Sequence, residues 1–197
     1  MDKLHIFDID GTVLDSMPMW ENLPTLFLER RGIEAPADLA ETVDHMSVPE
    51  TNEYIAETYG IEGGAEAVMS GMNEVLKVQY DSVLEPFDGI VSELSELSAT
   101  GACMIVFSNT PHVYLDRALE RHGLMKFFER VYAVEDIGVR KDNRKSYEIV
   151  CQDMGFDTAD AILYDDSDYA LNAAKEAGLE VKKYDRYRGI GKQGLKK

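Results

Sequence analysis

Residues 4–16 read Leu-His-Ile-Phe-Asp-Ile-Asp-Gly-Thr-Val-Leu-Asp-Ser, and the rest of the chain is best understood outward from this stretch. The continuous apolar run predicts a parallel strand buried on both faces, since such strands do not alternate polar and apolar residues. Asp8 is then expected at the carboxyl edge of a sheet, where open α/β sheets bind ligands. Gly11 permits a sharp turn with exposed backbone N–H groups. The stretch therefore predicts a place for a metal ion and a phosphate group.

The composition limits the partners of the protein. The chain has 197 residues, which suffices for one domain or for a domain with a subdomain, and its formal net charge is −17. Nucleic acids and anionic membranes bind basic patches, so neither is expected as a partner. An anionic substrate needs a local positive site, most simply a divalent cation.

Cysteine usage and the N-terminus indicate a cytoplasmic protein. Cys103 and Cys151 lie in apolar stretches whose spacing fits no metal motif, so two buried, reduced thiols are expected. The N-terminal segment lacks the basic start and long apolar core of a signal peptide. No segment approaches the length of a membrane span.

Residues 16–85 differ from the rest of the chain. Their apolar residues recur at helical spacing, and they include 14 acidic but only 3 basic residues. Proline-bearing segments at 16–18 and 84–87 flank the region, and proline ends regular structure. The sequence therefore predicts a helical subdomain over 16–85, inserted into a main domain formed by 1–15 and 86–197.

Strands and helices alternate in the pattern after Pro86. Helices are expected over 89–100, 113–122, 145–154 and 170–177, and strands over 102–107, 131–134, 161–164 and 180–183. Repeated strand–helix units predict an α/β fold with a doubly wound, Rossmann-like parallel sheet. Residues 182–197 carry 7 basic residues and 1 acidic residue, and this tail is expected to be a solvated or frayed end.

Polar side chains follow three of the expected strands. These clusters are Asp8 with Asp10, Ser108 with Asn109, and Asp165 with Asp166. A parallel sheet brings all three to one edge, and Lys141 falls in the loop between the second and third clusters. Four carboxylates close together ionise only beside a cation, and an oxygen-only ligand set suits Mg²⁺. A hydroxyl, backbone amides and one lysine suit the remaining oxygens of a phosphoryl group.

In this order of motifs the chain resembles the haloacid dehalogenase-like hydrolase superfamily, in the branch with a helical cap after the first strand. Four signatures carry the resemblance: Asp8-Ile9-Asp10-Gly11-Thr12; Ser108-Asn109-Thr110; Lys141 with Tyr147; and Asp165-Asp166-Ser167 with Ala173-Ala174-Lys175-Glu176-Ala177-Gly178. The resemblance covers nearly the whole chain. It implies a phosphatase acting on a small phosphorylated metabolite.

The resemblance also implies a role for each matched residue. Asp8 is the expected nucleophile, which forms an aspartyl-phosphate, and Asp10 is the expected general acid and base. Mg²⁺ is expected on the Asp8 carboxylate, the Asp10 backbone carbonyl and Asp166, with Asp165 acting from behind or through water. The phosphate-binding residues are expected to be Gly11, Thr12, Ser108, Asn109 and Lys141.

Two departures from the family pattern leave questions open. The usual lysine-proline-x-proline is Lys141-Asp142-Asn143-Arg144 here, so Lys145 is a rival for the phosphate lysine, although the spacing to Tyr147 favours Lys141. Many relatives carry an aspartate four residues after the metal aspartate. That position is Ala170 here, which puts a supporting hydrogen bond in doubt.

Other functions remain as alternatives. A phosphomutase is disfavoured because Trp20 stands where the sugar-phosphate mutases carry a histidine, and a phosphonate hydrolase because no lysine lies between Lys3 and Lys77. A phosphorylated receiver domain would order its acidic residues differently and would lack the helical insert. A catalytically inactive, phosphate-binding relative is a further alternative. The small number of basic residues in the cap favours a substrate with a neutral or lightly charged leaving group, while the oligomeric state cannot be inferred.

Overall fold

The computed structural model describes residues 3–187, which divide into two compact units. The core unit comprises the residues up to Ser16 and those from Leu84 onward, and the cap unit comprises Met17–Val83. These divisions fall one or two residues from the boundaries expected at 15/16 and 85/86. Each unit is described by itself below.

The core unit is built on five parallel strands. In the sheet they follow the order β3-β2-β1-β4-β5. The strands are β1 (Leu4–Phe7), β2 (Cys103–Ser108), β3 (Arg130–Ala133), β4 (Ala161–Asp165) and β5 (Glu180–Lys183). The apolar run at the start of the chain is thus the central strand. Phe7 pairs with Val106 of β2 and with Tyr164 of β4, so the polar residues after β1 meet the ends of β2 and β4.

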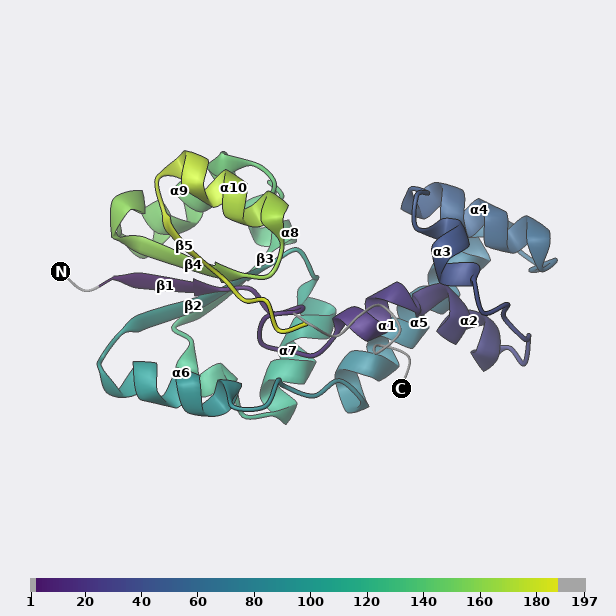
Figure 1. Ribbon diagram of the computed structural model, residues 1–197, viewed down its shortest axis with the longest axis horizontal. Coiled ribbons are helices and arrows are strands. Elements are labelled where there is room, and N and C mark those ends of the chain that lie inside the picture. Colours follow the sequence, from purple (N-terminus) through teal and green to yellow (C-terminus); the bar gives the residue numbers. More distant parts are fainter. Residues whose placement is uncertain (1–2, 188–197) are drawn as a thin grey trace. The chain divides into compact units, whose positions relative to one another are not determined.

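Helices cover both faces of this sheet, which confirms the doubly wound α/β fold. Figure 1 shows α9 and α10 over one face and α6 over the other. The helices of the core unit are α6 (Ile90–Ala99), α7 (His112–Arg121), α8 (Val134–Ile137), α9 (Arg144–Met154) and α10 (Asp168–Ala177), with 3₁₀ turns η1 (Met125–Phe127) and η2 (Thr158–Asp160). The apolar side chains of α9 and α10 pack on β1, β2 and β4, and this cluster forms the core.

The structure corrects small parts of the expected element pattern. The strand expected to reach Val134 ends at Ala133, because the Asp136 side chain accepts a hydrogen bond from the Ala133 backbone N–H and begins α8 there. Helix α10 begins at Asp168, two residues earlier than expected. The short α8, η1 and η2 were not expected, because one helical turn is too short to show a periodic pattern.

The cap unit is entirely helical. Its elements are α1 (Met17–Glu21), α2 (Leu23–Arg30), α3 (Leu39–Val43), α4 (Val48–Thr58) and α5 (Gly64–Ser82). Apolar side chains from α2, α4 and α5, including Phe27, Ile55 and Val68, form its buried cluster. Helix α4 begins with a capping box, because Glu50 accepts hydrogen bonds from the Ser47 backbone N–H at 2.8 Å and from the Ser47 hydroxyl at 2.6 Å.

The two linkers to the cap unit lie against each other within the core unit. The Asp15 backbone N–H donates to the Glu85 carbonyl at 2.9 Å, and that of Phe87 donates to the Val13 carbonyl at 3.0 Å. Leu14 and Pro86 form an isolated antiparallel bridge. The two linkers therefore form one small paired element.

Both cysteines are free thiols. Cys151 is buried as expected. Cys103 was also expected to be buried, but it is the first residue of β2 and is only partly buried. Within the described residues, no helix has the length and apolar character needed to cross a membrane.

Candidate active site

The loop after β1 carries the first two acidic residues. The Asp8 backbone N–H donates to the Tyr164 carbonyl at 2.9 Å, which fixes Asp8 beside the end of β4. The chain then turns tightly, and the Ile9 carbonyl accepts hydrogen bonds from the next three backbone N–H groups after Gly11. Gly11 has φ of +76°, a conformation that costs a residue with a side chain free energy. This turn leaves Asp8 buried and Asp10 partly exposed.

A buried ion cluster joins β1, β4 and the loop before α9. The Lys141 Nζ donates to Asp8 Oδ1 at 2.6 Å and makes a short contact with Asp165 Oδ2. The side chains of Lys141 and Asp165 are almost fully buried, at 2% and 1% exposed, and Asp8 is 9% exposed. Buried charges cost several kcal/mol each unless they are paired, so the cluster depends on all three partners. The Ser167 hydroxyl and backbone N–H hold the other Asp165 oxygen at 2.6 and 2.8 Å.

The electrostatics of this cluster favour an additional cation. Burial alone would lower the pKa of Lys141, but Asp8 and Asp165 together raise that pKa well above its usual value. Burial raises the pKa of Asp8 well above its usual range, and the charges of Asp165 and Asp10 add to this effect against the opposing charge of Lys141. The raised pKa of Asp8 indicates that the single ammonium group of Lys141 does not offset the burial of this carboxyl and the carboxylates beside it.

Three carboxylates form a set that fits a metal ion. Oxygen atoms of Asp8, Asp165 and Asp166 lie within 4.8 Å of one another. Burial, followed by the charge of Asp165, raises the pKa of Asp166 to about 6. A donor set of carboxylate oxygens without nitrogen or sulfur suits Mg²⁺, which usually binds one or two carboxylates and keeps water or phosphate as further ligands. The residues present thus fit the expected ion.

Asp10 is bound by a residue that follows the end of β2. The Thr110 hydroxyl donates to Asp10 Oδ2 at 2.7 Å, and the Thr110 backbone N–H donates to the Ser108 hydroxyl at 3.0 Å. No separate role was expected for Thr110. Its position directly after Ser108-Asn109 was the available signal, but only the fold brings it against a residue 100 positions earlier.

Two other expected phosphate-binding residues, Thr12 and Asn109, contact Asp8 and Lys141. The Thr12 hydroxyl lies 3.5 Å from Asp8 Oδ2, at the limit of a hydrogen bond. The Asn109 side-chain oxygen accepts from the Lys141 backbone N–H at 3.3 Å, and its amide nitrogen lies 3.2 Å from the Tyr169 hydroxyl. Asn109 thereby connects the loop that carries Lys141 to the end of β2.

The structure separates the two candidate lysines. Lys141 is buried among the carboxylates, whereas Lys145 is exposed on the first turn of α9, where its backbone N–H is bound by the capping Asn143 side chain. Asp168, two residues before Ala170, is exposed and pairs with Lys183 at 2.7 Å. It therefore does not replace the aspartate that many relatives carry at position 170, and Ser167 supports Asp165 instead.

The cap unit contains a mainly apolar pocket of about 420 Å³. Trp20, Met46, Met69 and Met72 contribute to its wall. Its charged lining residues are Glu21 and Asp44, and none of the Lys, Arg or His residues among 3–187 lines it.

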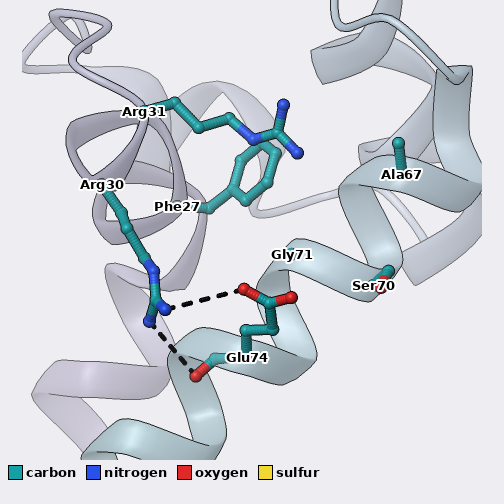
Figure 2. Close-up of a pocket in the computed structure, with 7 residues that line it drawn as sticks. All are labelled: Phe27, Arg30, Arg31, Ala67, Ser70, Gly71 and Glu74. Atoms are coloured by element: carbon teal, nitrogen blue, oxygen red, sulfur yellow. Dashed lines mark hydrogen bonds and ion pairs between the residues drawn. The ribbon is translucent and has the colours of Figure 1, made fainter.

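A second pocket of the cap unit, about 370 Å³, lies between α2 and α5. In Figure 2, Arg30 points toward Glu74, and its Nη2 lies 3.6 Å from Glu74 Oε2. Arg31 lies beside Phe27, with the guanidinium carbon 4.9 Å from the ring centroid. Both arginines are exposed, and each has a partner within the cap unit: Glu74 for Arg30 and Phe27 for Arg31.

Comparison with known proteins identifies the family. Residues 5–183 match the haloacid dehalogenase-like hydrolase family. The chain belongs to this family. The match spans the first strand, the cap unit and all the clusters at the carboxyl edge of the sheet, so the resemblance inferred from the four signatures is confirmed.

Curated relatives of similar length are phosphatases by name. A phosphorylated carbohydrates phosphatase of Thermotoga maritima is 23% identical over 177 residues, which cover 89% of this chain and 81% of the relative. A phosphoglycolate phosphatase of Vibrio parahaemolyticus is 24% identical over 199 residues, with 89% and 80% covered. Together with the family match, these names support a phosphoric monoester hydrolase.

Solved structures share the fold. A protein of Thermotoga maritima assigned as a beta-phosphoglucomutase has a TM-score of 0.82 at 20% identity, with 92% of this chain and 84% of that chain covered. YfnB of Bacillus subtilis, assigned as a HAD-hydrolase and bound to magnesium, has a TM-score of 0.77 at 18% identity, with 91% and 87% covered.

Proposed function

We propose that this protein is a Mg²⁺-dependent phosphatase that hydrolyses a small organic phosphate monoester through an aspartyl-phosphate on Asp8. One observation carries the proposal: two aspartates only two residues apart have different surroundings. Asp8 lies in the buried cluster with Lys141, whereas Asp10 is bound by Thr110 and is partly exposed. Different environments for two neighbouring carboxylates are typical of sites in which one attacks and the other transfers protons.

The proposed reaction divides between these residues. An Asp8 carboxylate oxygen attacks phosphorus, and the bond to the leaving oxygen breaks. Asp10 donates a proton to that oxygen and then accepts one from the water that hydrolyses the aspartyl-phosphate. Thr110 orients the Asp10 carboxyl through its 2.7 Å hydrogen bond. Lys141 and Ser108 bind oxygens of the transferring group, whose charge must be stabilised.

The carboxylates of Asp8 and Asp166 and the backbone carbonyl of Asp10 would hold the metal ion, with Asp165 behind them or acting through water. A bound Mg²⁺ supplies positive charge that polarises the phosphoryl group and offsets the excess of carboxylates in the cluster. Support comes from the 4.8 Å carboxylate set and from a structural relative bound to magnesium.

We further propose that the cap unit selects the substrate and favours a leaving group that is neutral or lightly charged. Its pocket beside Trp20, Met46, Met69 and Met72 is mainly apolar, and the charged residues that line this pocket are both acidic. A carboxylate or a polyphosphate would be repelled by such a lining. A clear preference for nucleotides over sugar phosphates would contradict this part of the proposal.

The test is phosphate release from a panel of phosphorylated metabolites, with and without Mg²⁺. We expect turnover that requires Mg²⁺ and that falls by at least about a thousandfold in Asp8→Asn, as is typical when a nucleophile is removed. The matched control is Asp168→Asn, which alters an exposed carboxylate beside the same sheet edge. Retained turnover in Asp8→Asn would overturn the mechanism. Mg²⁺ binding without turnover on any ester would instead favour the inactive relative.

A further inference from the structure

The described chain continues for four residues beyond the family match, and this segment contacts the linkers of the cap unit. Residues 184–187 follow β5 directly, while the family match ends at 183. The Tyr184 backbone N–H donates to the carbonyl of Asp165 at 2.9 Å, so the segment begins beside the ion cluster. We infer that residues 184–187, called the strap below, restrain the two linkers and thereby set how freely the cap unit moves.

Tyr187 contacts both linkers with one side chain. Its hydroxyl makes a short hydrogen bond to Asp15 Oδ1 in the first linker. Its ring meets Phe87 of the second linker edge-on, with centroids 5.4 Å apart. The Asp15 backbone is also hydrogen-bonded to Glu85, so Tyr187 contacts two linkers that are already paired with each other. A change of linker geometry must break or shift these contacts.

Arg186 and Tyr184 fasten the strap to α6. Both Nη2 contacts from Arg186 to the Glu93 carboxylate measure 3.1 Å, and the Tyr184 hydroxyl donates to Glu93 at 2.9 Å. The Arg186 guanidinium carbon also lies over two aromatic rings, 4.5 Å from the ring centroid of Tyr184 and 5.7 Å from that of Phe87. The Arg186 side chain is 23% exposed and that of Glu93 is 46% exposed, so only the arginine end of this ion pair is sheltered from solvent.

These contacts allow the strap to influence the geometry of the linkers. Hinges work through a few residues that absorb the backbone change, and here each linker has one residue held by Tyr187. Opening and closing of a cap commonly limits turnover in enzymes with lids. The strap therefore acts as a positioning element for the linkers.

A matched pair of variants tests the inference on the full chain. Tyr187→Phe and Tyr184→Phe each remove one hydroxyl that binds a carboxylate, but only Tyr187 touches the linkers. Amide hydrogen exchange is measured at residues 13–16 and 84–87. We expect about tenfold faster exchange there in Tyr187→Phe, the change expected for one hydrogen bond to a charged group, and none in Tyr184→Phe.

A second measurement separates positioning from simple stability. In Tyr187→Phe, kcat should change with little change in KM, whereas Tyr184→Phe should change the melting temperature alone. Asp15→Ala removes the acceptor of the same hydrogen bond, so it should give the same linker exchange as Tyr187→Phe, and the double variant should add nothing further. Linker exchange that is equal in the two tyrosine variants would overturn the inference. Because exchange is read without a substrate, this result is independent of the proposed phosphatase activity.

Discussion

The core unit buries charged side chains, whereas the cap unit leaves its charged side chains at least partly exposed. In the core unit, Lys141, Asp8 and Asp165 are buried and touch one another. In the cap unit, which the structure describes throughout Met17–Val83, the one buried polar residue is Asn52, and the acidic residues lie outside the apolar cluster. Charge that is buried at a cost indicates binding or chemistry, whereas exposed charge indicates solvation. The two units should therefore respond differently to substitution.

Removal of the buried ammonium group is expected to have the largest effect. Lys141→Met leaves Asp8 and Asp165 buried without their cation, so the free energy of unfolding should fall by about 3–5 kcal/mol at neutral pH, with loss of phosphate release. Chemical unfolding and phosphate assays measure both. Lys145→Met, an exposed control, should stay within about 0.5 kcal/mol. Equal effects of the two substitutions would remove the contrast between buried and exposed charge.

Mg²⁺ should stabilise the core unit in a pH-dependent way. Burial raises the pKa of Asp166 to about 6, so protons compete with the metal below that pH. At a hundredfold excess over Kd, the ion should add about 2.7 kcal/mol near neutral pH and clearly less as the pH falls below the pKa. Melting temperatures with and without Mg²⁺ check this. The metal site would be contradicted if the Mg²⁺-induced rise in melting temperature were the same at neutral pH and below the Asp166 pKa. A rise that persists in Asp166→Asn would contradict it as well.

A methyl group at position 71 should disturb the packing of the cap unit. A Cβ on Gly71 would lie 2.3 Å from Phe27 Cε2, and Phe27 is 1% exposed (Figure 2). The overpacking cost of about 1–3 kcal/mol should exceed the gain of about 1 kcal/mol that alanine normally brings to a helix. Thermal unfolding of Gly71→Ala against Ser70→Ala, on the exposed side of the same helix, measures it. An increase in stability would contradict the predicted overpacking. A weaker Mg²⁺ shift in the core unit would argue against separate responses of the two units.

The smallest expected effect concerns a half-exposed charge in the core unit. The His112 ring lies 3.0 Å from Asp116 and 2.7 Å from Asp136. Burial lowers the pKa of His112, but the two carboxylates outweigh it and raise the pKa above its usual value. The charged ring thus stabilises the fold at low pH, and this contribution is lost as the pH rises through the raised pKa.

His112→Gln should therefore cost less than about 1 kcal/mol, and the cost should shrink from acidic to alkaline pH. Denaturant unfolding across that range is the measurement. His45→Gln, an exposed histidine of the cap unit, is the control and should show little change. A cost for His112→Gln that grows with pH would contradict the assignment of charge.

Much of the fold and of the candidate site could be predicted from local pattern. The apolar run before Asp8 and the glycine-terminated helices predict a parallel sheet, and a parallel sheet must bring its strand ends to one edge. The pattern could not show that Thr110 would meet Asp10, because that contact depends on the exact register of β1 with β2. The strap was also missed: Arg186 and Tyr187 belong to a basic tail that was expected to be solvated, and no local signal marks Asp15 and Glu93 as their partners. Residues 188–197 of that expectation lie outside the described residues.

The sequence by itself determined the order of the elements, the helical insert and the identity of the acidic residues after β1, because these follow from periodicity and residue type. Only the tertiary structure shows that Lys141 is buried among the carboxylates, whereas Lys145, four residues later on the first turn of α9, is exposed. Their chemistry is identical, and burial between Asp8 and Asp165 makes the difference. Folding likewise separated Asp8 from Asp10, since one faces a buried ammonium group and the other a threonine hydroxyl.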